Sequence, residues 1–215
     1  MAAIRILITG AGRTSGATTA TELTRAGHEV VATARDATLL DELGVALRLT
    51  LDVTDDASVA AALDAAGELE VVVNVSSVQG RVATPLDGPY AASKYALESL
   101  SKTLHYELAH FGIRVVIIEP GYTAPGMKMG SRVKGDPAYT ELWEQWGNTD
   151  ELVTGPAGRP GPELVARAIA SAIEDTQIPL RVPVGDDAAM VLGARSALGD
   201  AEFEATMRAV LGATW

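Results

Sequence analysis

Continuous runs of Val, Ile and Ala alternate with helix-like stretches through the first half of the chain. Residues 29–34, 70–75 and 113–119 are such runs. Strands that are apolar at every position are typical of parallel sheets, because both of their faces are covered. Parallel strands also need long crossovers, which the intervening helical stretches supply. The pattern predicts an α/β fold: a doubly wound parallel sheet with helices on both faces.

Length and composition favour a single domain. The chain has 215 residues, of which 47% are hydrophobic, enough to build one sizeable core. We find no repeat or interdomain linker and expect one domain over residues 1–215. Residues 123–161, rich in Gly and Pro, are predicted to form a long loop with a short helix near 136–146.

Charge and cysteine content exclude several classes of function. The chain has 17 Lys and Arg against 28 Asp and Glu, a formal net charge of −11. This acidity argues against binding to nucleic acid or to an anionic membrane. Cysteine is absent, and the three His are scattered, so we expect no disulfide and no metal site. With no apolar run of membrane-spanning length and no signal peptide, the expected location is the cytoplasm.

The first apolar run, residues 4–9, leads into a glycine-rich turn and then into a helix predicted over 15–26. Glycine at a strand-to-helix turn lets the backbone approach a pyrophosphate, which lies at the helix N-terminus. This context predicts a dinucleotide site; the alternative is a glycine-rich connection without a ligand. The residues of the turn are Gly10, Gly12, Arg13, Thr14, Ser15 and Gly16.

Arg35 follows the second apolar run. An acid at this point binds the ribose hydroxyls of NAD, whereas a basic group holds the 2′-phosphate of NADP. Arg13 can converge on the same phosphate, although Asp36 beside Arg35 weakens the inference. The pair favours NADP(H), with NAD(H) as the second choice; the alternative is two solvated surface arginines.

Tyr90 and Lys94 lie at positions i and i+4 of a helix predicted over 90–110, and therefore on one helical face. A nearby ammonium favours the phenolate and lowers the pKa of a tyrosine, which makes Tyr90 a proton donor and acceptor near neutral pH. Ser77, upstream, can offer a hydroxyl to the oxygen that changes protonation. Taken alone, such a pair is more often a partly buried tyrosine beside a surface lysine.

The order of these motifs resembles that of the classical short-chain dehydrogenase/reductase family over almost the whole chain. The resemblance implies a Rossmann-like fold and an NAD(P)-dependent enzyme that transfers hydride between nicotinamide and a carbonyl/alcohol substrate. It implies Tyr90 as general acid/base, Lys94 as the residue that lowers its pKa and binds the nicotinamide ribose, and Ser77 as the residue that orients the substrate oxygen. The motifs are the glycine turn, Asp52-Val53, Ser77, Tyr90, Lys94 and Pro120-Gly121.

The resemblance also implies a cofactor-binding set. Asp52 is expected to contact adenine with Val53 beside it, and Pro120-Gly121 to flank the nicotinamide, with Thr123 near its carboxamide. Thr14 stands where the family has Gly, and its Cβ crowds the approach to the pyrophosphate. The whole implied set is Gly10, Gly12, Arg13, Thr14, Ser15, Gly16, Arg35, Asp52, Val53, Asn74, Tyr90, Lys94, Pro120, Gly121 and Thr123.

One strand–helix segment of the family pattern is missing. The family has two strands where this chain passes from 70–74 directly to Val75-Ser76-Ser77, and Asn74 matches the Asn that ends either strand. We therefore expect a sheet one strand short. If the merged strand takes the earlier place, Ser77 and Tyr90 shift by about 4.8 Å relative to the cofactor; if it takes the later place, a gap opens in the sheet.

The missing segment would carry a fourth catalytic residue of the family and part of its dimer interface, which leaves homo-oligomerisation open. The main alternative to an active enzyme is a cofactor-binding relic or redox sensor with impaired catalysis. A sugar-nucleotide epimerase or dehydratase is the third reading.

Apolar and aromatic residues of the 123–161 loop favour a hydrophobic ketone, aldehyde or alcohol as substrate, covered by this loop. The alternative is that they close the core of the domain itself. These residues are Met127, Met129, Tyr139, Leu142, Trp143 and Trp146.

Overall fold

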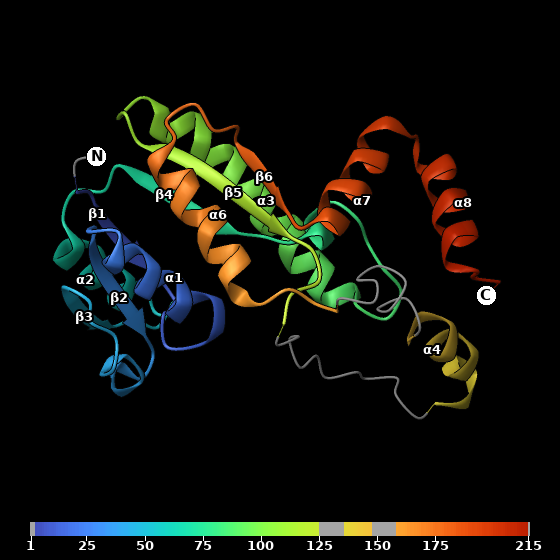
Figure 1. Cartoon of the computed structure of the whole chain (residues 1–215), viewed down its shortest axis with the longest axis horizontal. Coiled ribbons are helices and arrows are strands. Elements are labelled where there is room, and N and C mark those ends of the chain that lie inside the picture. The colour runs from blue at the N-terminus through green and yellow to red at the C-terminus, as the bar shows by residue number, and fades with distance from the viewer. Residues whose placement is uncertain (1–2, 125–135, 148–157, 215) are drawn as a thin grey trace. The chain divides into compact units, whose positions relative to one another are not determined.

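The computed structural model describes residues 3–124, 136–147 and 158–214, so Met127 and Met129 lie outside it. Strands and helices alternate along these residues (Figure 1). The elements are β1 (Arg5–Ile8), α1 (Thr14–Arg25), β2 (Glu29–Ala34), η1 (Ala37–Leu40), β3 (Leu47–Thr50), α2 (Asp56–Ala66), β4 (Val71–Val75), η2 (Val78–Gly80), α3 (Gly88–Ala109), β5 (Arg114–Pro120), η3 (Pro137–Tyr139), α4 (Thr140–Gly147), α6 (Pro162–Glu174), β6 (Arg181–Val184), α7 (Asp186–Ala197) and α8 (Asp200–Leu211), where η marks a 3-10 helix.

The strands of the described residues form two three-stranded sheets, in the orders β1-β2-β3 and β4-β5-β6. The first sheet is parallel throughout. In the second, the N–H of Arg114 donates to Glu70 O and the N–H of Ser76 donates to Ile118 O. Both strands advance in the same direction between these bonds, so β4 and β5 are also parallel. The predicted α/β, Rossmann-like fold is confirmed.

The merged strand β4 pairs with β5, the strand that follows it in the chain. The six strands of the described part of the chain agree with a sheet one strand short.

Burial explains the continuous apolar runs. In β2, Val30, Val31 and Ala32 are fully buried, as are Ile117 and Ile118 of β5. These strands are covered on both faces, as predicted. By contrast, β3 alternates half-buried and exposed positions because it is the edge strand of its sheet.

The chain divides into two compact units. The first comprises residues 1–74, 101–117 and 162–182, and the second comprises 75–100, 118–161 and 183–215. In the first unit α1 packs on β2 and α6, while α2 contacts β1 and β3.

In the second unit α7 contacts η2 and α8. A small core there is built on Val82, Leu192 and Phe203, with Val78 and Met207 packed against it. Helix α7 was not predicted, whereas η3 and α4 lie where the short helix near 136–146 was expected. No helix in the described ranges is long and apolar enough to cross a membrane.

Candidate active site

The glycine turn between β1 and α1 is tightly folded. Gly10 has φ +68°, a left-handed conformation that favours glycine. A Cβ on Gly16 would collide with the carbonyl oxygen of Gly10, and a Cβ on Gly12 would lie 2.8 Å from Leu39 Cβ. Backbone packing therefore requires glycine at Gly16, and the Leu39 side chain leaves little room for more than glycine at Gly12. The turn is attached to β2 by Ala11 N–H, which donates to Thr33 O at 2.9 Å.

The N-terminus of α1 suits an anion. Its N-cap residue, Arg13, makes no side-chain capping hydrogen bond, and the first turn holds no acid. Backbone N–H groups at such an end are ready donors to a phosphate. Thr14 has φ +39°, so the position where the family has Gly does adopt a conformation that favours Gly. Ser15 follows it in the same turn.

Asp36 is engaged locally. Its carboxylate caps η1, accepting from Thr38 N at 3.1 Å and from Thr38 Oγ1 at 2.6 Å. These bonds, the side-chain one first, hold the pKa of Asp36 below its usual range. The carboxylate is thus used in the fold, while Arg35 and Arg13 are exposed at the ends of β2 and of the glycine turn.

Asp52 and Val53 follow β3. The carboxylate of Asp52 accepts from Thr54 N at 3.0 Å and from Thr54 Oγ1 at 2.7 Å. Its pKa is lowered chiefly by the backbone bond from Thr54, and Arg35 lowers it further by its charge. The structure therefore brings Arg35 and Asp52 together. Val53 is 66% exposed, an apolar side chain in solvent beside them.

Asn74, near the end of β4, is tied to helix α3. Its side-chain amide donates to Ser101 Oγ at 2.8 Å, and Ser101 is fully buried. This contact is structural, and it joins the merged strand to the helix that carries Tyr90 and Lys94.

Ser77 is buried at the end of β4, where it caps η2. Its hydroxyl oxygen accepts from Gln79 N at 3.2 Å, and the hydroxyl donates to Pro120 O at 3.5 Å. The structure therefore brings Ser77 and Pro120 together, two residues that the sequence assigned to one site. Gly121 continues from this point, with its N–H donating to Val184 O, and half-buried Thr123 follows.

Lys94 and Tyr90 are in contact on α3. The ammonium of Lys94 lies 5.7 Å from the centroid of the Tyr90 ring and donates to Val75 O at 2.9 Å. The end of β4 thus holds the ammonium beside the tyrosine. Burial lowers the pKa of Lys94 from its ordinary 10.5.

This pKa shift predicts a pH dependence of stability. Between the lowered pKa of folded Lys94 and 10.5, the unfolded chain binds more protons than the folded chain. The contribution of Lys94 to the free energy of unfolding therefore rises with pH across that window. We expect the free energy of unfolding of wild type, relative to that of Lys94→Met, to increase as the pH rises towards 10.5. Denaturant unfolding at a series of pH values measures it. A difference that is flat or falls with pH would contradict the lowered pKa.

A cavity of about 420 Å³ lies within the second unit. The segment between Ser77 and Tyr90 forms one wall, and α4 and α8 form the others. Leu142 and Trp146 of the predicted substrate loop contribute to it, whereas the part of α8 in this cavity was not predicted. The lining residues are Val82, Ala83, Thr84, Pro85, Leu142, Gln145, Trp146, Phe203, Glu204, Met207, Arg208, Leu211 and Ala213.

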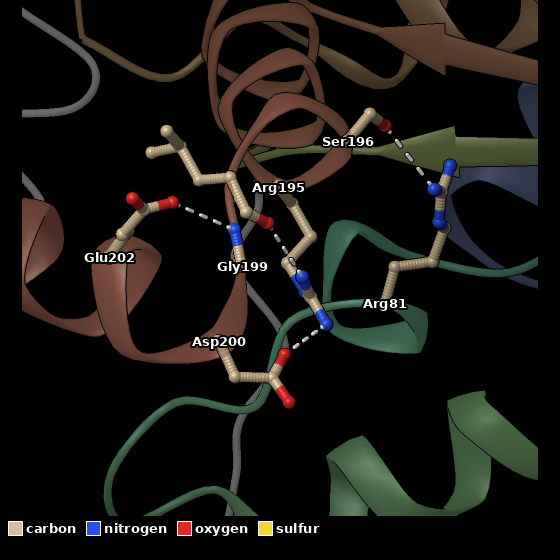
Figure 2. A network of polar contacts seen from close by, with 7 residues as sticks. Arg81, Arg195, Ser196, Gly199, Asp200 and Glu202 are labelled. Carbon is tan, nitrogen blue, oxygen red and sulfur yellow. Dashed lines mark hydrogen bonds and ion pairs between the residues drawn. The ribbon is translucent and has the colours of Figure 1, made fainter.

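A polar network fixes the α7–α8 corner and so the wall that α8 provides (Figure 2). Arg195 donates to Leu198 O at 3.3 Å and pairs with Asp200 at 2.5 Å. Gly199 N–H donates to Glu202 Oε2 at 3.3 Å. From the Ser77–Tyr90 segment, Arg81 donates to Ser196 Oγ at 3.4 Å.

Arg81 also lies 3.9 Å from the fully buried carboxylate of Glu119 in β5. This pair was not anticipated, because Glu119 closes an apolar run and nothing in the pattern indicates its partner. Within the described ranges no group of three or more His, Asp or Glu is placed to hold a metal ion.

Comparisons with known proteins agree with this geometry. The sequence model described as short chain dehydrogenase matches residues 66–135, and that of the NAD dependent epimerase/dehydratase family matches residues 6–87. An uncharacterized oxidoreductase of Schizosaccharomyces pombe is 34% identical over 66% of this chain and 60% of its own length. The chain thus spans less than two thirds of this curated relative. Mouse retinol dehydrogenase 16 is 45% identical over 34% of this chain and 22% of its own.

Solved structures extend the likeness to the whole chain. A short-chain dehydrogenase from Streptomyces avermitilis matches with a TM-score of 0.75 and 28% identity over 100% of both chains. A short chain dehydrogenase from Burkholderia cenocepacia in complex with NADP matches in fold, with a TM-score of 0.69 and 18% identity over 97% of both chains. The glycine turn, the Tyr90–Lys94 contact and these matches point the same way: the chain is similar in sequence and in fold to short-chain dehydrogenases.

Proposed function

We propose that the chain is an oxidoreductase that transfers hydride between NADP(H) and a hydrophobic carbonyl or alcohol. The contact between Lys94 and Tyr90 carries this proposal. Val75 O holds the ammonium 5.7 Å from the tyrosine ring centroid. A cation so placed stabilises a phenolate, the form that Tyr90 takes after it gives up its proton.

The residues present fit a nicotinamide dinucleotide. The α1 N-terminus has no side-chain cap, and at Gly16 a Cβ has no room beside the turn. We assign the pyrophosphate to this turn, the adenine to Asp52 and Val53, and the 2′-phosphate to Arg13 and Arg35. Pro120, Gly121 and Thr123 are assigned to the nicotinamide, which supplies or accepts the hydride when bound.

Side chains of the second unit transfer the proton. In the reducing direction the Tyr90 hydroxyl gives its proton to the carbonyl oxygen as that oxygen gains negative charge. The Ser77 hydroxyl, which has a single hydrogen, donates it to the same oxygen in place of its long 3.5 Å bond to Pro120 O. The Lys94 ammonium stabilises the phenolate that remains, and its own burial strengthens that attraction.

We assign the body of the substrate to the cavity beside the Ser77–Tyr90 segment, although Ser77, Tyr90 and Lys94 themselves are not among its lining residues. Its volume of about 420 Å³ lies within the range of small-molecule pockets, roughly 300–1,000 Å³. Apolar side chains such as Phe203, Met207 and Leu142 dominate the lining, which suits an apolar substrate body. Retinol dehydrogenase 16, named for a hydrophobic alcohol, is among the relatives.

The epimerase reading is less well supported. The epimerase/dehydratase match covers residues 6–87, the cofactor half that both kinds of enzyme need. The short chain dehydrogenase match covers residues 66–135, which include Ser77, Tyr90 and Lys94.

The proposal is tested by titrating the purified chain with NADPH and NADH, and then by following NADPH consumption with a panel of hydrophobic ketones and aldehydes. We expect preferential NADPH binding and turnover of at least one class. Binding without turnover would support the alternative, a cofactor-binding relic or sensor. Failure to bind either nucleotide would reject both.

Cofactor preference makes a separate prediction. Substituting Arg35→Ala removes a charge-assisted bond to the 2′-phosphate, so we expect the Kd for NADPH to rise about 10- to 100-fold. NADH, which lacks that phosphate, should bind with unchanged affinity. Arg25→Ala is the matched control, since it removes an exposed arginine from the last turn of α1. An equal loss for both nucleotides in Arg35→Ala would contradict the assignment.

A further inference from the structure

Strands β5 and β6 are neighbours in a parallel sheet, so their carboxyl ends meet at one edge. At this edge open α/β sheets bind ligands. Strand β5 ends at Pro120, and Gly121 N–H donates to Val184 O, the last residue of β6, at 3.1 Å. The segment that follows β6 therefore reaches the turn that follows β5.

Asp187, in the first turn of α7, binds the turn that follows β5. Its half-buried carboxylate accepts a hydrogen bond from Tyr122 N at 2.7 Å. A Cβ on Gly121 would collide with this carboxylate, and one on Gly185 would lie 2.5 Å from Asp187 Oδ1. The carboxylate thus fills the space that two glycines leave open.

We infer that Asp187 is a positioning residue that holds Pro120, Gly121 and Tyr122 in the conformation that receives the nicotinamide. The turn is also held from a second side, by the Ser77 hydroxyl on Pro120 O. Asp187 thereby acts on the same turn as a catalytic hydroxyl without touching the reacting atoms. This inference rests on the proposed function and extends it to Asp187, which is not among the site residues expected from the sequence.

The test compares two ligands that share the adenine end. Asp187→Ala removes the acceptor for Tyr122 N, and we expect the Kd for NADPH to rise about tenfold. Adenosine 2′,5′-bisphosphate lacks the nicotinamide and should bind as in wild type. A merely structural role would instead lower Tm and weaken both ligands alike.

Two further variants sharpen the test. Asp187→Asn keeps a side-chain carbonyl oxygen as acceptor, so it should restore most of the NADPH affinity. Asp186→Ala is the matched control, because it removes an exposed acid from the same turn of α7 and should leave both affinities unchanged.

Each outcome is decisive. If wild type binds NADPH, and Asp187→Ala binds it as Asp186→Ala does, the inference is wrong while the proposed function stands. If Asp187→Ala weakens both ligands equally, Asp187 is structural and the inference is again wrong. If wild type binds neither ligand, the proposed function itself fails.

Gly121→Ala checks the contact independently of any ligand. The nearest atoms to an added Cβ all belong to the Asp187 carboxylate. The substitution should lower Tm in wild type but much less in the Asp187→Ala background, since residues in contact give non-additive effects. Equal losses in both backgrounds would show that Asp187 does not press on this turn.

Discussion

Replacing Tyr90 by Phe is expected to reduce NADPH-dependent carbonyl turnover by roughly 100- to 10,000-fold, the range that general acid–base catalysis supplies. The change removes one oxygen and leaves the ring in place. The Lys94 ammonium keeps its bond to Val75 O, and the ring it faces is preserved. The affinity for NADPH should therefore stay at the wild-type level, so that kcat falls while the Kd of the cofactor does not change.

Tyr95→Phe provides the matched control. Tyr95 lies on the same helix with a 45% exposed side chain, and it has no part in the proposed site. We expect its turnover to match that of wild type. Full activity in Tyr90→Phe would show that another group transfers the proton, and loss of activity in both variants would indicate damage to α3 rather than to catalysis.

Periodicity and composition were sufficient to predict a strand where both of its faces are covered. Strands β2 and β5 are continuous apolar runs, and the structure buries nearly every position of both. The glycine turn could also be predicted from the sequence, because Gly10 needs a positive φ and Gly16 has no room for a side chain. Such constraints are local, so they determine which residue types stand at neighbouring positions of the sequence.

The sequence could not reveal contacts that depend on how distant segments meet. Asp187 looks like any acid at a helix start, and only the 2.7 Å bond from Tyr122 N shows what it holds. Helix α7 buries only Ala188 and Leu192, too few apolar positions for its pattern to predict a helix. The part that α8 plays in the cavity depends on the α7–α8 corner, which Arg195 and Asp200 secure.

The merged strand shows both the reach and the limit of sequence reasoning. A missing strand–helix segment was evident from Asn74, which fits two family motifs. Two places for the strand were compatible with the pattern, and the structure pairs it with β5. Such a pairing joins residues about 40 positions apart in the chain, and a local pattern does not specify it.

Replacing Gly16 by Ala is expected to abolish measurable NADPH binding. The added methyl group would overlap the carbonyl oxygen of Gly10, a backbone atom of the same turn. The turn must open to remove this overlap, and overpacking of this kind costs about 1–3 kcal/mol in stability. An opened turn also moves the N–H donors at the start of α1 away from a pyrophosphate. Isothermal titration with NADPH, alongside a thermal melt, separates the two effects.

Gly44→Ala is the control for Gly16→Ala, since a Cβ at Gly44 meets open space and its φ is not in the left-handed region. It should bind NADPH as wild type does and unfold at the same temperature. If Gly16→Ala lowers Tm but binds NADPH normally, the pyrophosphate does not lie on this turn. The assignment of the 2′-phosphate to Arg13, a residue of the same turn, then fails as well. If binding is lost while the melt shows a folded chain, the loss follows from the turn alone, because the Tyr90–Lys94 contact and the cavity lie in the other unit.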